Sequence, residues 1–310
     1  MTEVLGTQTS GDDITRVPIG NDRLSVDILT LGSILSSVRL DNGPNMTVPP
    51  RDIFDRPGDE ALIGPIVGPV VNRLTMPVEL DGTDLPLTPV TEDGFVLHSG
   101  DGGTFDRVWD IEAHTPTALT LAVDLVDGLG GFPGNRTITA TWSVDGADLI
   151  LDITATTDAP TLMNIAHHPY WTLDGSKNGR DGHQMASPAR RYTPSTEIAT
   201  PTGDIDPVAG SDYDFTRLTP PAADLDASLC LDDAPSDAPR PAATLISDGR
   251  RRLDILTTAP GLQIFTGKPY GIALEPQLWP NAPAHPSFPS IRLAAGATFE
   301  QHTIYRFSTI

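Results

Sequence analysis

Two adjacent histidines, His167 and His168, stand in a run of strand-forming residues and are the first candidates for chemistry. The next residue is a proline, which disfavours the helical region for the residue before it, so His168 is expected to be extended. Side chains in a strand point alternately to opposite faces of the sheet. His168 therefore shares a face with Asn164 and Tyr170, whereas His167 points the other way. Only one of the two histidines can serve a given site.

A second run, 271–279, carries a single carboxylate, Glu275, among mostly apolar residues. Glu275 is also followed by proline, and strand alternation sets it against Ile272 and Leu274. A buried carboxylate is costly unless it has a partner, and such groups are candidate acids or bases. Histidine titrates near neutral pH, so His168 and Glu275 together could transfer protons. The plain alternative is that Glu275 pairs with an arginine and that the histidines are ordinary hydrogen-bonded residues.

Three other polar residues are candidates for ligand binding. Arg73 ends an apolar run, His98 lies where a strand meets a glycine-rich loop, and Asp226 stands in the segment Leu-Asp-Ala-Ser-Leu. Each has a structural alternative: a surface charge for Arg73, a structural histidine for His98, and a turn or capping role for Asp226. The residues alone leave these alternatives open.

Length and charge limit the classes of protein and of partner. A chain of 310 residues can bury a sizeable core, as one large β domain or two smaller ones. Its net charge of −21 argues against nucleic acid or an anionic membrane surface as a partner. The only cysteine, Cys230, excludes an intramolecular disulfide. No signal peptide or membrane span is visible, because the most apolar run, 61–71, is short and broken by glycine and proline, so a cytoplasmic protein is expected.

The elements that carry these residues are expected to be strands. Asp-Gly pairs at 81–82, 145–146 and 248–249 stand between segments of alternating apolar residues, a pattern typical of β-hairpins. No segment shows a long period near 3.6 residues, and 30 prolines and 28 glycines interrupt the chain throughout. The sequence therefore predicts an all-β fold, a large antiparallel β-sandwich with many hairpins.

Seven motifs, taken in order along the chain, resemble those of the aldose 1-epimerase (mutarotase) family. They are GPVVNRL at 68–74, LHSGDGGTFDRVWD at 97–110, GLGGFPGN at 128–135, the histidine run at 164–175, the segment 225–231, PGLQIFTG at 260–267 and the run 271–288. The resemblance implies a single domain over 1–310, a galactose mutarotase-like β-supersandwich. It also implies interconversion of the α and β anomers of a free sugar.

The resemblance assigns roles to particular residues. It implies that His168 is the acid and Glu275 the base, and that Arg73, His98 and Asp226 contact the sugar. Anomer exchange opens the ring by removing a proton from the C1 hydroxyl and giving one to the ring oxygen. A base and an acid on opposite sides of the sugar would suffice, so no metal, nucleotide or other cofactor is expected.

Two residues depart from the family pattern close to these motifs. Pro69 stands where the family often has arginine, and His167 stands where it often has asparagine. Both positions are expected to lie near the site and to bear on sugar preference more than on the reaction. Trp171 and Trp279 could stack on a sugar, but core packing is the favoured interpretation for both.

Other functions are disfavoured for stated reasons. A metal-dependent β-barrel enzyme could use His167 or His168 with Glu275, but adjacent histidines in a strand diverge and no ligand-type histidine spacing exists. A carbohydrate-binding module without catalysis would not need both His168 and Glu275. A sugar-phosphate mutarotase on the same fold would need a cationic pocket, which an acidic chain does not suggest. The expected partner is a free hexose or pentose, and the sequence does not fix which one, nor the oligomeric state.

Overall fold

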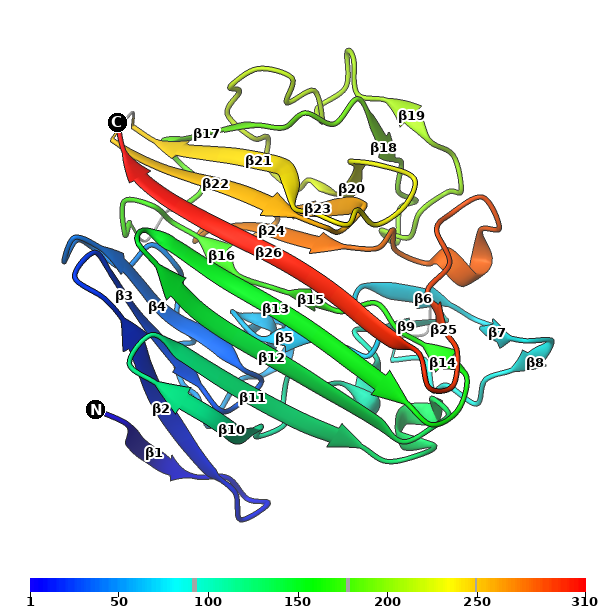
Figure 1. Ribbon diagram of the computed structural model, residues 1–310. Helices are drawn as coiled ribbons and strands as arrows, with labels where there is room; N and C mark the ends of the chain where they lie inside the picture. The colour runs from blue at the N-terminus through cyan, green and yellow to red at the C-terminus, as the bar shows by residue number, and fades with distance from the viewer. Residues whose placement is uncertain (91–93, 177–178, 249) are drawn as a thin grey trace.

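The computed structural model describes residues 1–90, 94–176, 179–248 and 250–310, and in these ranges the chain is built almost entirely from antiparallel strands (Figure 1). The expected all-β, antiparallel architecture is confirmed. The helical elements described are short 3-10 turns: η1 (Gly58–Leu62), η2 (Gly100–Gly102), η3 (Leu129–Gly131) and η4 (Ala282–Ala284). Within the described ranges, no helix is long and apolar enough to span a bilayer.

The largest sheet has eight strands, and its middle is the long C-terminal strand β26, which crosses Figure 1 diagonally in red. β26 pairs with β13 on one side and with β22 on the other, so the last strand joins the middle of the chain to its later part. In sheet order the strands are β10 (Asp110–Thr115), β11 (Ala118–Leu125), β12 (Arg136–Asp145), β13 (Asp148–Thr157), β26 (Thr298–Thr309), β22 (Arg251–Thr257), β21 (Arg240–Ser247) and β17 (His183–Ala186).

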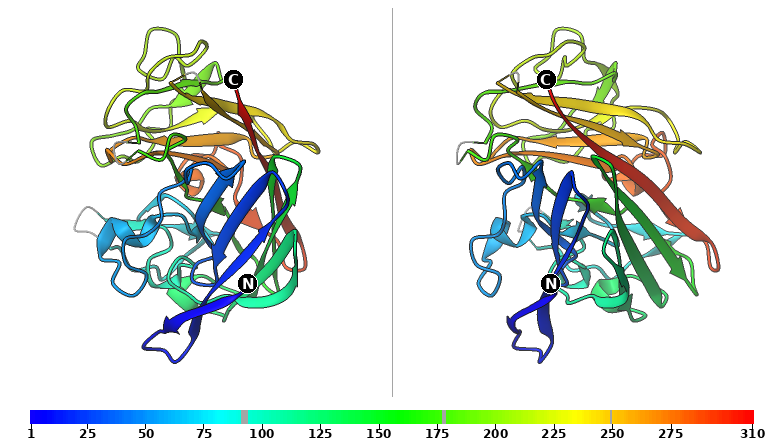
Figure 2. Two further views of the ribbon diagram at one scale, coloured as in Figure 1. Left: turned by 90° about the vertical axis from the view of Figure 1, so that its left-hand side faces the viewer. Right: turned by 60° about the vertical axis from the view of Figure 1, so that its left-hand side comes forward.

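A six-stranded sheet carries Asp226 and Glu275, two of the five predicted site residues. In order its strands are β16 (Tyr170–Trp171), β24 (Ile272–Gln277), β23 (Gly261–Phe265), β20 (Asp226–Cys230), β18 (Arg191–Thr193) and β19 (Asp206–Pro207). A four-stranded N-terminal sheet, blue in Figures 1 and 2, completes the large sheets. Its strands are β1 (Glu3–Thr7), β2 (Asp13–Gly20), β3 (Leu24–Leu29) and β4 (Ile34–Leu40).

Small two-stranded sheets connect the large ones. They pair β14 (Thr161–Leu162) with β25 (Arg292–Leu293), β15 (Ala166–His167) with β5 (Ile66–Val67), β6 (Arg73–Thr75) with β9 (Phe95–Leu97), and β7 (Glu79–Leu80) with β8 (Thr83–Asp84). The β5–β15 and β6–β9 pairs bring two of the sequence motifs, around Arg73 and His98, toward the histidine run.

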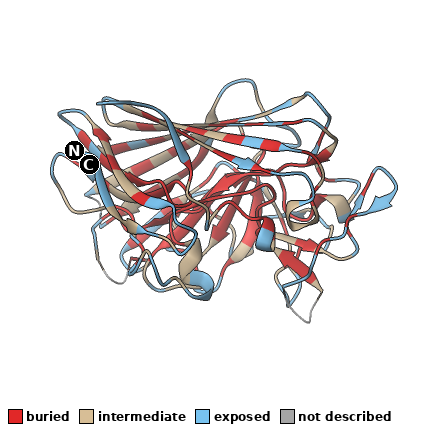
Figure 3. Ribbon diagram, turned by 90° about the horizontal axis from the view of Figure 1, so that it is seen from below, coloured by how far each residue is buried: buried red, intermediate tan, exposed pale blue. Residues whose placement is uncertain are grey.

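One hydrophobic cluster joins the three large sheets. It contains Val26 of the N-terminal sheet, Leu121 and Leu253 of the eight-stranded sheet, and Ile264 of the six-stranded sheet, all buried. Figure 3 shows the buried residues concentrated between the strand layers, with exposed residues at loops and strand ends. Burial of these apolar faces, worth about 25 cal/mol per Å² of apolar surface, is what holds the sheets together.

The predicted hairpins follow from turn chemistry. Asp81 and Gly82 both have positive φ (51° and 81°) and join β7 to β8 in a two-residue loop, as a type I′ turn requires. Asp145 ends β12, and Gly146, at φ 58°, begins the turn into β13. At the third pair, Gly249 lies outside the described residues, while the flanking strands β21 and β22 are antiparallel partners.

Candidate active site

All five predicted site residues line one cavity of about 120 Å³. They are separated by up to 202 positions in the chain (from 73 to 275), and each arrives on or beside a different strand. They are Arg73 at the start of β6, His98 after β9, His168 between β15 and β16, Asp226 at the start of β20, and Glu275 in β24. The fold thus brings together all five residues to which the family resemblance assigns roles.

His168 and Glu275 are in direct contact. The Nε2 of His168 lies 3.4 Å from the Oε1 of Glu275, and the two side chains are 6% and 2% exposed. The contact is set by strand pairing, because β16 lies beside β24 with Tyr170 opposite Ala273. Glycine at 271 permits this close approach, since a Cβ there would lie 2.8 Å from the Cβ of Tyr170. The two candidate proton-transfer groups are therefore neighbours on facing segments.

His167 points into the core, as strand alternation predicted. Its Nδ1 is 3.0 Å from the hydroxyl of Tyr305, and its ring packs edge-on against Trp142 with ring centroids 5.0 Å apart. It is buried and does not line the cavity.

The two departures from the family pattern do not line the cavity, so any effect they have on sugar preference would be indirect and stays a prediction. Strand alternation turns His167 away from the cavity, and Pro69 does not line it either. The Pro69 carbonyl instead accepts a backbone hydrogen bond from Asn164 at 2.7 Å.

Arg73 and Asp226 form an ion pair inside the cavity. Arg73 Nη1 donates to Asp226 Oδ2 at 3.1 Å and to the carbonyl of Ala199 at 3.3 Å, and the guanidinium lies over the ring of Phe95. The other Asp226 oxygen, Oδ1, accepts from Gln263 Nε2 at 2.6 Å. The two side chains are only 20% and 19% exposed, which excludes the simple surface-charge interpretation of Arg73.

His98 is fixed in one tautomer. Its Nδ1 accepts a hydrogen bond from the backbone N–H of Asn72 at 3.0 Å, so the proton of the neutral ring is on Nε2. The His98 backbone lies in the left-handed region (φ 51°) and is stabilised by its own N–H, which donates to the Asn72 carbonyl at 2.9 Å. The imidazole meets His168 edge-on, with ring centroids 5.6 Å apart. His98 can therefore offer a hydrogen-bond donor beside the His168–Glu275 pair.

Burial controls the protonation of the site. It lowers the pKa of His168 to about 4 and lowers the pKa of His98 well below its ordinary value. It raises the pKa of Glu275 well above its ordinary value, and the nearby carboxylate of Asp226 adds to that rise. Because charged forms are costly in a desolvated site, these shifts favour the neutral arrangement of the His168–Glu275 pair, with its proton on the carboxyl group.

The cavity also contains residues that were not identified as candidates from the sequence. Gln263 lies opposite Glu275 in the antiparallel register of β23 and β24, and its place in an apolar strand was a usable signal. Tyr170 shares the face of His168, as alternation indicated. Asp59 comes from η1, in a proline-rich connection that carried no sequence signal.

The two tryptophans that were considered for sugar stacking lie outside the cavity. Trp171 and Trp279 are buried in hydrophobic clusters and do not line the cavity, so the prediction of core packing is confirmed. Over the ranges of the chain that are described, no group of three or more His, Cys, Asp or Glu residues is placed to share a metal ion.

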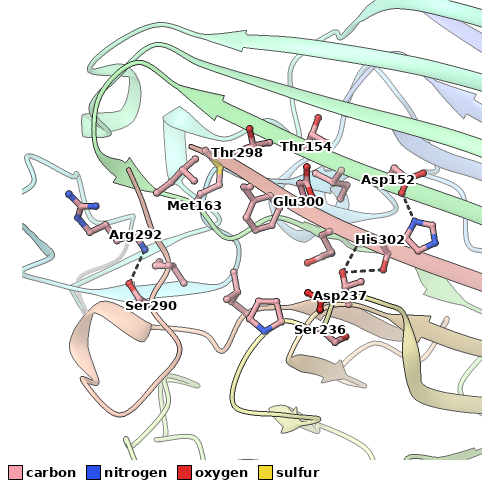
Figure 4. Close-up of a pocket in the computed structure, with 18 residues that line it drawn as sticks. Asp152, Thr154, Met163, Ser236, Asp237, Ser290, Arg292, Thr298, Glu300 and His302 are labelled. Carbon is pink, nitrogen blue, oxygen red and sulfur yellow. Dashed lines mark hydrogen bonds and ion pairs between the residues drawn. The ribbon is translucent and has the colours of Figure 1, made fainter. Parts of the chain in front are cut away.

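A larger groove of about 770 Å³ lies along β13 and β26 (Figure 4). It has polar groups, among them Asp152 hydrogen-bonded to His302, and an apolar wall that includes Met163. None of the five predicted site residues lines it. The smaller cavity, with its buried His168–Glu275 contact, is therefore the candidate active site.

Comparison with known proteins agrees with this geometry. The family model described as aldose 1-epimerase matches residues 15–306. The galactose mutarotase of Mus musculus is 27% identical, covering 97% of this chain and 96% of that protein. The aldose 1-epimerase of Escherichia coli K12 is 29% identical, covering 80% of each chain.

Solved structures share the fold over nearly the whole chain. The crystal structure of a GalM/aldose epimerase homologue from C. elegans superposes with a TM-score of 0.86 at 25% identity, covering 96% of this chain and 99% of the other. A galactose 1-epimerase from Lactobacillus acidophilus NCFM gives 0.84 at 23% identity, covering 100% and 99%. With a family model that matches almost every residue, the chain belongs to the aldose 1-epimerase family.

Proposed function

We propose that this protein is an isomerase that interconverts the α and β anomers of a free aldose, with Glu275 as the base and His168 as the acid. The observation that carries the proposal is the buried contact of 3.4 Å between His168 Nε2 and Glu275 Oε1. Hydrogen-bonding groups surround this pair in the same cavity. Membership of the family supports the same reaction.

The two groups are adjacent, not separated by the width of a sugar. This placement suits the reaction because the C1 hydroxyl oxygen and the ring oxygen are bonded to the same carbon. The carboxylate of Glu275 removes the proton from the C1 hydroxyl as the bond between C1 and the ring oxygen breaks. The imidazolium of His168 gives its proton to the ring oxygen. Rotation about the C1–C2 bond exposes the other face of the aldehyde, and the reverse transfers close the ring.

Proton counting shows why the pair need not exchange protons with water during turnover. One proton is shared by His168 and Glu275 in every step: it passes from the carboxyl group, where burial favours it, to the histidine before ring opening, and the carboxyl group carries a proton again once the ring is open. The pair therefore stays neutral overall throughout the cycle. Burial favours the arrangement that accompanies the open-chain sugar, so that intermediate is formed without building up charge in a desolvated site.

The remaining residues are proposed to hold the sugar. His98 Nε2–H donates to a sugar oxygen, because its Nδ1 is already occupied by the Asn72 N–H. Arg73 donates to hydroxyl oxygens, and Asp226 accepts from hydroxyl groups with the lone pairs that its two donors leave free. Each bond restricts the ring to the orientation in which C1 faces the acid–base pair.

The substrate is proposed to be a single unphosphorylated hexose or pentose. The cavity is small, about 120 Å³, and the net charge of −21 disfavours a nucleic acid. We also propose that residues 1–310 form one catalytic domain and that the protein is cytoplasmic. The hydrophobic cluster that runs from Val17 to Phe307 supports the first of these points.

Polarimetry tests the proposal directly. Freshly dissolved α anomers of a panel of hexoses and pentoses are mixed with purified protein, without cofactor and with a chelator present. The expected result is faster mutarotation of at least one aldose than in buffer alone. Activity that is lost on chelation and restored by a divalent metal would contradict the mechanism, as would a lack of acceleration across the whole panel.

A further inference from the structure

An ion pair stands at the rim of the cavity. Asp59, from η1, lines the cavity together with His168 and Glu275. Its Oδ2 lies 2.6 Å from the Nζ of Lys268, which comes from the segment after β23, three residues beyond Phe265 of the cavity wall. The pair thus joins two segments that are 209 positions apart (59 and 268). Asp59 lines the cavity itself, whereas Lys268 does not.

Arg73, the arginine or lysine that lines the cavity within the described residues, and Lys268, which meets the cavity residue Asp59, both have anionic partners. Arg73 is paired with Asp226, and Lys268 is paired with Asp59. The His168–Glu275 contact holds one shared proton and is neutral overall. A neutral sugar fits this balance of charge, whereas a phosphate group would bring about two negative charges to a cavity whose lining arginine is already paired.

We propose that Asp59 makes this site selective for uncharged aldoses, because its carboxylate occupies Lys268 and repels a phosphate or carboxylate group carried by the substrate. This inference rests on the proposed function and specifies its substrate class. Of the residues that line the cavity, Glu275 is 2% exposed and Asp59 is 60% exposed, so Asp59 lies on the side that is open to solvent. A charged substituent that extends toward solvent would pass this side. There the substituent meets the carboxylate of Asp59, which repels it. The ammonium group of Lys268 is also there, but it is already paired with that carboxylate at 2.6 Å.

The electrostatic effect of Asp59 extends into the cavity. Although burial lowers the pKa of His168 to about 4, the negative charge of Asp59 opposes that shift. The same charge that reaches the acid–base pair would act on an anionic group of a bound substrate. Asp59 itself is 60% exposed, so the ion pair contributes little to folding and its replacement should leave the protein folded.

The test compares three sugars. Glucose, glucose 6-phosphate and 6-O-methylglucose share one ring, and the methyl ether adds bulk at the same oxygen without charge. Dissociation constants from isothermal titration calorimetry, at low ionic strength, give the ratio of phosphate to methyl ether affinity for each variant. Where the sugar is turned over, inhibition of mutarotation by the phosphate gives a second measure. Calorimetry reports selectivity without turnover, so failure of this inference can be told apart from failure of the catalytic proposal.

Asp59→Asn should raise the relative affinity for the phosphate about tenfold or more, because it frees Lys268 and removes the like charge. This gain in relative phosphate affinity should shrink at high salt, because salt screens the interaction between exposed charges. Adding Lys268→Met to Asp59→Asn should remove most of the gain. Asp55→Asn, an exposed change of equal charge in the same connection, should give no gain.

Two results would overturn the inference. One is an Asp59→Asn protein that binds the neutral sugars normally yet discriminates against the phosphate as strongly as the unmodified protein. The other is an equal gain from Asp55→Asn, which would show that net charge alone sets the selectivity. Weak binding of 6-O-methylglucose, matching that of the phosphate in all variants, would mean that size excludes the substituent and would also overturn it.

Discussion

Gln263 lies directly opposite Glu275 in the register of β23 and β24, and its Nε2 donates to the Asp226 carboxylate at 2.6 Å. The candidate base and the Asp226–Arg73 pair are thus neighbours on one sheet face. The negative charge of Asp226 contributes to the raised pKa of Glu275, whereas the positive charge of Arg73 opposes it. The charge state of one pair is therefore coupled to the proton affinity of the other.

Asp226→Asn should move the pH profile of turnover to lower pH. The replacement removes a negative charge that raises the pKa of Glu275 and leaves Arg73, which lowers it. Because His168 and Glu275 titrate together, both limbs of the kcat/KM profile should shift in the same direction. KM should rise as well, since a sugar-holding acceptor is lost. Profiles measured by polarimetry from about pH 4 to 9 check this, and a shift to higher pH would contradict the coupling.

The adjacent histidines should behave differently when each is replaced by asparagine. His168→Asn removes the proposed acid and should reduce turnover by about 10²-fold or more, with a folded protein. His167→Asn should instead lower stability by about 1–3 kcal/mol, because it disrupts the buried contact with the Tyr305 hydroxyl. Its turnover per folded molecule should stay close to normal.

Tyr305→Phe is the matched control for the core histidine. It removes the hydroxyl that meets His167 Nδ1 and keeps the ring. If the two residues act through this bond, the double replacement should cost less than the sum of the single ones. Should His167→Asn be the variant that stops turnover while remaining stable, the assignment of faces in this segment would be wrong.

Much of this arrangement could be predicted from local rules. Alternation of side chains placed His168 and His167 on opposite faces, and the Asp-Gly pairs marked hairpins such as the one at Asp81. Local rules could not reveal that Arg73 would pair with Asp226, because that contact depends on two sheets meeting. Asp59 was missed for a related reason, since its proline-rich connection has no periodicity from which a face can be assigned.

The buried histidines should make the protein sensitive to acid. Burial lowers the pKa of His167 to about 3 and that of His168 to about 4, from an ordinary value of 6.5. The unfolded chain then binds protons at a higher pH than the folded one. Stability should therefore fall as pH drops below about 6.5, by about 1.4 kcal/mol per pH unit for each such histidine.

Urea unfolding at several values between about pH 7 and 4 measures this slope. His167→Asn should reduce the slope of unfolding free energy against pH by about 1.4 kcal/mol per pH unit, the contribution of one proton. That variant also starts from a lower stability at pH 7. Glu275 acts with the opposite sign: its raised pKa gives stability that is present at low pH and is lost as pH rises through the raised value. A slope unchanged by His167→Asn would show that folding does not lower the pKa of this histidine, contrary to the prediction.

The central claim is that Glu275 transfers a proton at the C1 hydroxyl, and Glu275→Gln tests it most directly. Glutamine matches the shape of the neutral carboxyl group that burial favours, so the variant should fold with nearly unchanged melting temperature and sugar affinity. Turnover should fall by about 10²-fold or more, as expected for loss of a general base. A structural ion pair would behave differently, because breaking a buried pair costs about 3–5 kcal/mol. A Glu275→Gln protein that melts much earlier, yet retains near-normal mutarotation per folded molecule, would contradict the account.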